Sequence, residues 1–184
     1  MLIFALIAQF LSPSFQLPYP CGKIPSGMSC VPGGWFIRGA NDQRRDQRPR
    51  AKIYVNTFLL DRYEVTAGEY DRCVLEGRCV YQKTNYNHFS HDDQPKVGLS
   101  WYAARNYCRV MGKDLPTEAQ WEKAARGPDG EKNPWGNESA TCSLAVIMNK
   151  KGRGCGAKAV SREKGRTADV GSRPVGRYGL YDMI

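Results

Sequence analysis

Residues 112–122 read Gly-Lys-Asp-Leu-Pro-Thr-Glu-Ala-Gln-Trp-Glu, and this stretch says more about the fold than any other. Thr117 and Gln120 have the spacing of a capping box, in which each side chain accepts a hydrogen bond from the backbone N–H of the other residue. Pro116 keeps the residue before it extended, which fixes where the helix begins. Apolar residues follow at helical spacing, and Gly127 is a typical helix end. The stretch therefore predicts a short, well-defined helix that follows an extended segment.

Two further helix starts precede this one. Thr66 and Glu69 form a second capping box. Ser100 is a typical N-cap residue, and Gly112 closes the helix that it opens. The apolar positions of that helix are three and four residues apart: Trp101, Ala104, Cys108 and Met111.

Extended segments lie closer to the N-terminus. Residues 31–39 predict a strand that a Gly-Gly turn opens, with Trp35 and Ile37 on one face. A second extended stretch runs from Ile53 to Leu60, and an arginine-rich loop separates the two. Short helices among strands and long loops predict an α+β fold.

Seven blocks of this sequence resemble, in the same order, the sulfatase-modifying-factor family, also called the formylglycine-generating-enzyme family. The blocks are residues 33–39 (GGWFIRG), 61–66 (DRYEVT), 97–108 (VGLSW, then AA and YC), 112–122 (GKDLPTEAQWE), 124–127 (AARG), 134–137 (PWGN) and 179–183 (GLYDM). Asp114 and Gln120 replace the family's usual Arg and Glu, which are small departures. The resemblance spans residues 31–183 and implies a C-type-lectin-like α+β fold rich in irregular loops.

The resemblance also suggests how the chain is divided. Residues 31–184 would form a partial family domain that is incomplete at its C-terminus, because the GLYDM block and Ile184 leave no room for the strands that should follow. Residues 17–30 would be an N-terminal extension. Residues 1–16 begin with a short apolar run that suits a signal peptide, although a basic start and a clear cleavage site are missing. An apolar strand or a misassigned start codon are the alternatives.

Copper and calcium are the cofactors that the family implies. In its founding enzymes two cysteines near the C-terminus hold copper, and oxygen is used to oxidise a cysteine of an unfolded sulfatase to formylglycine. Two thiolates suit Cu(I), but no cysteine of this chain aligns with those positions. We therefore predict no catalytic residue here and no oxidase activity for residues 1–184. Asp182 aligns with a calcium-ligand position, whereas Val146, Arg162 and Lys164 occupy the region of the other calcium site.

The seven cysteines include three near pairs. None has the spacing of a zinc ribbon, so disulfides in an oxidising compartment explain them better. On one continuous helix Cys73 and Cys79 would be too far apart for a bridge, unless Gly77 ends the helix and turns the chain back. Cys108 is left over, as a buried thiol or with its partner elsewhere. The residues expected in disulfides are the near neighbours Cys21 and Cys30, Cys73 and Cys79, and Cys142 and Cys155, although the sequence does not establish which cysteine pairs with which.

Charge and histidines add little chemistry. The net charge is +9, but its densest run, residues 44–50, contains an acid and a proline, which favours a solvated loop, with contact to a polyanion as the alternative. No nucleic-acid motif accompanies it, and no apolar segment is long enough to cross a membrane. His88 and His91 lie in a polar loop, where a metal site is the less favoured interpretation.

Three functions fit these observations. The first is a formylglycine-generating oxidase whose partner is an unfolded sulfatase peptide. The second is a non-catalytic, lectin-like binding or accessory module on the same fold. The third, a sulfoxide synthase, needs a histidine-rich iron domain that this sequence lacks. In each case we expect a monomer that is secreted or periplasmic.

Overall fold

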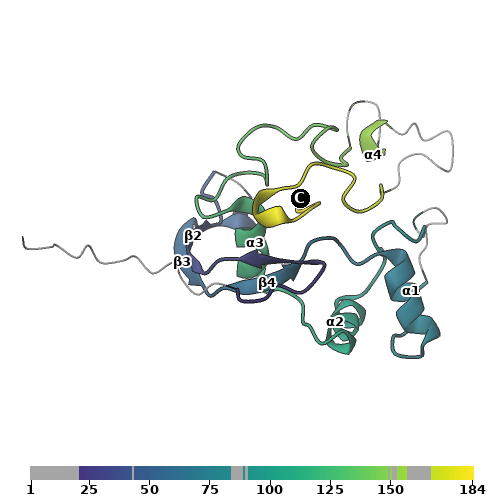
Figure 1. Cartoon of the computed structure of the whole chain (residues 1–184). Helices are drawn as coiled ribbons and strands as arrows, with labels where there is room; N and C mark the ends of the chain where they lie inside the picture. Colours follow the sequence, from purple (N-terminus) through teal and green to yellow (C-terminus); the bar gives the residue numbers. More distant parts are fainter. Residues whose placement is uncertain are drawn as a thin grey trace, which may run out of the picture.

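The computed structural model describes residues 21–42, 44–83, 89, 91–148, 150, 153–156 and 167–184. The expected signal peptide, His88, Arg162 and Lys164 lie outside these residues. Small strands and short helices alternate with long irregular segments, as the α+β prediction requires (Figure 1).

The strands form one interrupted ribbon. β1 (Met28–Val31) pairs antiparallel with β4 (Phe58–Asp61), and β2 (Gly34–Arg38) pairs antiparallel with β3 (Ala51–Val55). The two ladders share one register, which runs from Met28 opposite Asp61 to Arg38 opposite Ala51. The four strands are therefore two arms of a long hairpin that breaks once in the middle.

The break corrects the single strand predicted for residues 31–39. Val31 belongs to β1, and the ladder resumes only at Gly34. Gly33 lies so close to the opposite arm that an added Cβ would sit 2.8 Å from the backbone nitrogen of Thr57. The Gly33 N–H donates to the Thr57 hydroxyl at 2.8 Å. This side-chain bond takes the place of a ladder bond, and glycine is needed for the close approach.

Three helices begin where the capping residues predict. α1 (Ala67–Leu75) and α3 (Glu118–Arg126) each start with a complete capping box, from Thr66 and Thr117. α2 (Trp101–Val110) starts at Ser100, whose hydroxyl accepts from the Ala103 N–H at 3.2 Å. Shorter pieces complete the description: α4 (Arg153–Gly156) and the 3₁₀ segments η1 (Arg45–Gln47) and η2 (Arg177–Gly179).

All three expected disulfides are confirmed. The Cα–Cα distances are 5.9 Å for Cys21–Cys30, 5.3 Å for Cys73–Cys79 and 5.4 Å for Cys142–Cys155. Gly77 has a φ of +70° just after α1, and the N–H of Cys79 then donates to the Cys73 carbonyl at 3.1 Å. The chain turns back as predicted. Cys108 is the free thiol.

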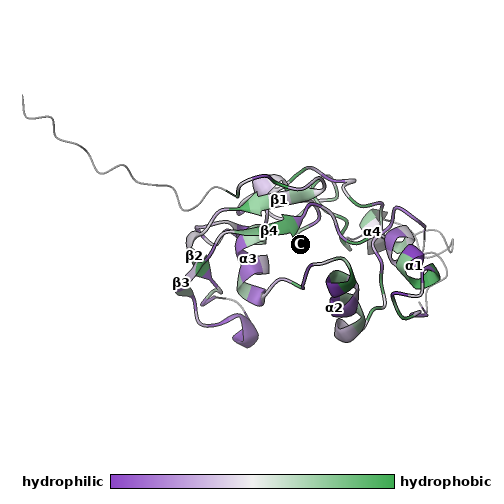
Figure 2. Cartoon of the chain, turned by 60° about the horizontal axis from the view of Figure 1, so that its bottom comes forward, coloured by the Kyte–Doolittle hydropathy of each residue, from purple (hydrophilic) through white to green (hydrophobic). Residues whose placement is uncertain are grey.

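Two apolar clusters form the interior. One joins Val31, Ala124 and Leu180, and in Figure 2 it includes the hydrophobic strand β4. The other joins Tyr70 and Tyr107, whose rings stack with centroids 5.6 Å apart, to the Cys73–Cys79 bridge. In Figures 1 and 2, β2 and β3 lie at the opposite end of the molecule from α1.

Lys123 is a buried cation beside the first cluster, 2% exposed. Its ammonium donates to the carbonyls of Pro32 at 2.7 Å and Gly34 at 3.1 Å. Burial lowers the pKa of Lys123. These two bonds offset part of the free-energy cost of burying the charge. They also connect α3 to the break in the hairpin.

Within the described part of the chain, every helix is too short or too polar to cross a membrane.

Candidate functional site

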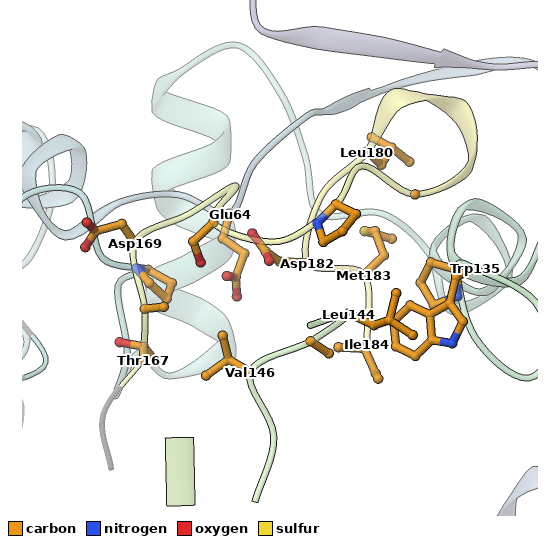
Figure 3. A pocket seen from close by; sticks show the side chains of 17 residues that line it. Glu64, Trp135, Leu144, Val146, Thr167, Asp169, Leu180, Asp182, Met183 and Ile184 are labelled. Carbon is orange, nitrogen blue, oxygen red and sulfur yellow. The ribbon is translucent and has the colours of Figure 1, made fainter. Parts of the chain in front are cut away.

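A cavity of about 170 Å³ opens beside the C-terminal segment (Figure 3). Glu64 and Asp182 supply carboxyl groups to it. Its apolar side is formed by Leu144 and Met183, and Trp135 of the PWGN block lies at one end. The cavity thus brings together four segments that are far apart in the sequence.

Glu64 is positioned by the entry to α1. It lies between β4 and the capping residue Thr66, in a stretch whose backbone is hydrogen-bonded to residues 94–96. The Lys96 N–H donates to the Val65 carbonyl at 2.8 Å, and the Ala67 N–H donates to the Gln94 carbonyl at 2.8 Å. These bonds fix the backbone next to Glu64 and so determine where its side chain leaves the main chain.

Asp182 is positioned by the turn after η2. The Tyr181 N–H donates to the Arg62 carbonyl at 2.9 Å, which ties this segment to the end of β4. Asp182 has a φ of +55°, and its Oδ2 accepts from the Gly171 N–H at 2.7 Å. That bond orients the carboxylate, and it helps to offset a backbone conformation that non-glycine residues seldom adopt.

The two carboxyl groups lie side by side in the centre of the cavity, whereas that of Asp169 points away (Figure 3). Glu64 has substantial exposed area as a residue, but its carboxyl group lies within the cavity. Its pKa is raised, first by burial and then by the negative charge of Asp182. A pair of this kind holds a proton more readily than two separate carboxylates and attracts cations.

Gln94 secures the far side of the cavity and is only 3% exposed. Its amide donates to the Thr167 carbonyl at 2.8 Å, and its amide oxygen accepts from the His91 N–H at 3.2 Å. The Val170 N–H donates to the Asp93 carbonyl at 2.9 Å. The polar stretch around His91 was noted in the sequence for its histidines. In the structure its neighbours Asp93 and Gln94 hold residues 167–170 in place by hydrogen bonds.

A second cavity, of about 410 Å³, lies between β4 and the helices α1 and α2. Cys108 and Met111 line it, together with an ion pair in which the Lys113 ammonium lies 2.5 Å from Asp61. The pKa of the Cys108 thiol is raised, first by burial and then by the carboxylates of Asp61 and Asp114. This thiol stays protonated at neutral pH, so it is a weak nucleophile and a weak metal ligand.

Comparison with known families identifies the family to which this fold belongs. The model of the sulfatase-modifying factor enzyme 1-like domain matches residues 16–184. The chain belongs to this family. The resemblance found in the seven sequence blocks is thereby confirmed.

Curated relatives include both active and inactive members of this family. The formylglycine-generating enzyme of Bos taurus is 26% identical over 210 residues, covering 87% of this chain and 56% of the relative. The inactive C-alpha-formylglycine-generating enzyme 2 of Bos taurus is 40% identical over 91 residues, covering 49% of this chain and 30% of the relative. YfmG, an uncharacterized protein of Bacillus subtilis, is 35% identical over 135 residues, covering 61% and 28%. The chain thus spans 56% of the length of the bovine formylglycine-generating enzyme and about a third or less of the length of the other two relatives.

Solved structures show the same fold at low sequence identity. Treponema denticola variable protein 1 superposes with a TM-score of 0.60 at 17% identity, over 89% of this chain and 71% of that one. The predicted C-type-lectin-like α+β fold of the formylglycine-generating-enzyme family is confirmed.

The cysteines of this family member do not fit the family's copper site. Six of the seven are in disulfides, and Cys108 supplies the remaining thiol, whose pKa is raised. A site of two thiolates cannot be built from one. The expectation that residues 1–184 hold no copper pair rests on this arrangement as well as on the sequence alignment.

For calcium, the described residues bring two carboxyl groups to one cavity, those of Glu64 and Asp182. Calcium takes roughly 6–8 oxygen ligands, and around Asp182 the structure shows Glu64 as the neighbouring carboxyl group. Among the residues that the structure covers, no three side chains of His, Cys, Asp and Glu form a metal-binding group. Val146 lines the same cavity, while Arg162 and Lys164 are outside the described residues.

Sequence reasoning placed Asp182 at this site but missed Glu64 and Gln94. A signal for Glu64 existed, since it is one of two acidic residues in the DRYEVT block, which we interpreted only as a helix entry. Gln94 carried no signal because the residue that it ties to the cavity, Thr167, lies 73 positions away in the sequence.

Proposed function

We propose that this protein is a sulfatase-modifying factor that acts on a cysteine of an unfolded sulfatase peptide. Residues 21–184 would supply the scaffold and the Glu64–Asp182 cavity. The family match over residues 16–184 and the relatives named formylglycine-generating enzyme support this assignment. Three disulfides support a protein of an oxidising, extracytoplasmic compartment.

The state of the seven cysteines indicates which part of the proposed activity residues 1–184 can supply. With six in disulfides and Cys108 protonated, residues 1–184 have no reactive thiol pair. In such a factor the two thiolates that would hold copper would have to come from outside these residues. A non-catalytic accessory module on the same fold would equally lack a reactive thiol pair, and an activity assay separates the two.

The assay uses a peptide with the Cys-x-Pro-x-Arg pattern, Cu(I) and oxygen, and detects the aldehyde by hydrazide labelling and mass spectrometry. The protein encoded by the whole open reading frame should form the aldehyde, and residues 1–184 alone should not. A peptide with serine in place of cysteine is the control, and C108A should behave like the unmodified 184-residue chain.

Two results would contradict the proposal. A folded whole-frame protein that forms no aldehyde would identify a non-catalytic module. Aldehyde formed by residues 1–184, and lost in C108A, would show that the buried thiol is reactive after all.

A further inference from the structure

The outer face of the β2–β3 ladder carries exposed aromatic rings and cations. Trp35 lies directly opposite Tyr54, and Lys52 precedes Tyr54 by two residues in β3, so these three are on one side of the ladder. Arg50 comes immediately before β3. Trp35 is 57% exposed and Tyr54 is 50% exposed, whereas Phe36, on the other side, is 1% exposed. We call Trp35, Arg50, Lys52 and Tyr54 the hairpin face. It lies at the end of the molecule opposite α1 (Figure 1).

The charge on and beside the hairpin face is strongly positive. Residues 35–55 contain six lysines and arginines against two aspartates. Arg44, in the connecting loop, is paired with Asp46. Arg50 and Lys52 are both exposed, and neither forms an ion pair within the described ranges. Two exposed cations that are two residues apart and have no carboxylate partner attract an anion more strongly than paired ones do.

The two rings meet edge to face. Their centroids are 5.6 Å apart with the planes at 78°. The Lys52 ammonium lies 5.7 Å from the centroid of the Trp35 ring, so this charge and this ring are presented together. The rings therefore do not make a flat, parallel platform. Trp35 and Tyr54 form an apolar surface of two rings at a steep angle to each other, and the Lys52 ammonium lies beside it.

We propose that the hairpin face binds an acidic polysaccharide, a chain of sugar rings that carry sulfate or carboxylate groups. The C–H face of a sugar ring is apolar and packs against the electron-rich face of an aromatic ring. Its anionic substituents would bind Lys52 and Arg50, and the arginine can contact a sulfate or carboxylate with two parallel hydrogen bonds.

Single-stranded nucleic acid fits this face less well. Successive bases bind by stacking flat on exposed aromatic rings, whereas here the plane of Tyr54 stands at 78° to that of Trp35. The three disulfides also favour a compartment where polysaccharides are the common polyanions. The hairpin face is separate from the Glu64–Asp182 cavity, so this inference does not depend on the proposed function.

The test measures binding of the whole 184-residue chain to immobilised heparin, alginate and neutral dextran of similar length, with a single-stranded oligonucleotide as a competitor. Heparin and alginate distinguish sulfate from carboxylate recognition. R50Q/K52Q removes the cations and W35A/Y54A removes the rings. The matched controls are K83Q/K132Q, which changes the net charge equally, and Y102A, which removes a ring that is 79% exposed on α2.

We expect binding to at least one of the acidic polysaccharides and none to dextran. Each hairpin variant should weaken that binding by about fivefold or more, a change of about 1 kcal/mol, and each control by less than about twofold. Circular dichroism of the variants shows that the fold is intact.

Three results would overturn the proposal. Equal weakening by K83Q/K132Q would mean that net charge alone drives binding. An oligonucleotide that binds more tightly, with the same dependence on the hairpin face, would identify a nucleic-acid surface. Absence of binding to both acidic polysaccharides at low salt would remove the site altogether.

Discussion

The region around β1, β4 and α3 and the region around α1 and α2 are held together in different ways. In the first, the cluster of Val31, Ala124 and Leu180 joins the beginning, the middle and the end of the described chain. In the second, the cluster of Tyr70 and Tyr107 is built within a much shorter stretch, with a disulfide at its centre.

The difference shows where long-range order is required. The first region needs correct strand register, the buried Lys123 and the C-terminal segment at the same time, because each packs against the others. The second region needs two capped helices and one covalent bond between residues six apart. Removing an element of the first region should therefore affect more of the molecule than removing an element of the second.

The largest effect is expected from Leu180→Ala. Leu180 is 1% exposed, and its truncation would leave a void between β1 and α3. Large-to-small changes in a core cost about 2–5 kcal/mol, which urea unfolding followed by fluorescence would measure. Leu75→Ala is the control, since Leu75 is 87% exposed and should change stability by less than about 0.5 kcal/mol. Equal losses in the two variants would mean that the C-terminal segment does not contribute to the core.

A smaller effect is expected when both Cys73 and Cys79 are replaced by alanine. The bridge closes a loop of six residues, and constraint of so short a loop in the unfolded chain is worth about 2 kcal/mol. Thermal unfolding should show the loss, with C108A as a control that removes a thiol but no bridge. Circular dichroism should retain the signal of α3 and the strands. Loss of all ordered structure would show that the two regions do not fold as separately as the contacts indicate.

The smallest effect concerns Glu64, at the boundary between the two regions. Because the pKa of Glu64 is raised in the folded state, the folded protein binds more protons than the unfolded chain between the ordinary and the raised pKa. Stability is therefore highest below the ordinary value and falls as the pH rises through that window. Unfolding measured from about pH 4 to about pH 8, which spans the ordinary pKa of glutamate, should show this decline.

Glu64→Gln should flatten the decline and make the protein more stable at neutral pH, because the repulsion with Asp182 is removed. Glu138→Gln, at an exposed position, is the matched control and should leave the pH dependence unchanged. A steeper decline in Glu64→Gln would mean that Asp182 depends on Glu64 for a favourable contact.

Local features could be predicted with residue accuracy. The helix starts at Thr66, Ser100 and Thr117 were correct because capping involves a side chain and a backbone N–H within the same turn. The Cys73–Cys79 bridge was predicted for a similar reason. Its feasibility depends on a single glycine, Gly77, that lies between its ends.

Features made by distant segments could not be predicted in this way. The ladder breaks after Val31 because Gly33 meets Thr57 on the other arm of the hairpin. No local pattern in the sequence marks Lys123 as buried. Only its packing against Pro32 and Gly34 makes it a buried cation.

The sequence by itself determined the family, the six cysteines available for disulfides, the starts of the helices and the lack of a thiol pair for copper. These depend on residue identity and on spacing over a few residues, whereas the structure established the disulfide pairing. Tertiary structure alone decided that Glu64 lies beside Asp182, that Gln94 clamps Thr167, and that Trp35 and Tyr54 share an exposed face with Lys52. The physical reason is that burial, pKa and surface chemistry depend on which groups become neighbours in space, and chain folding sets those neighbours at separations that no local pattern encodes.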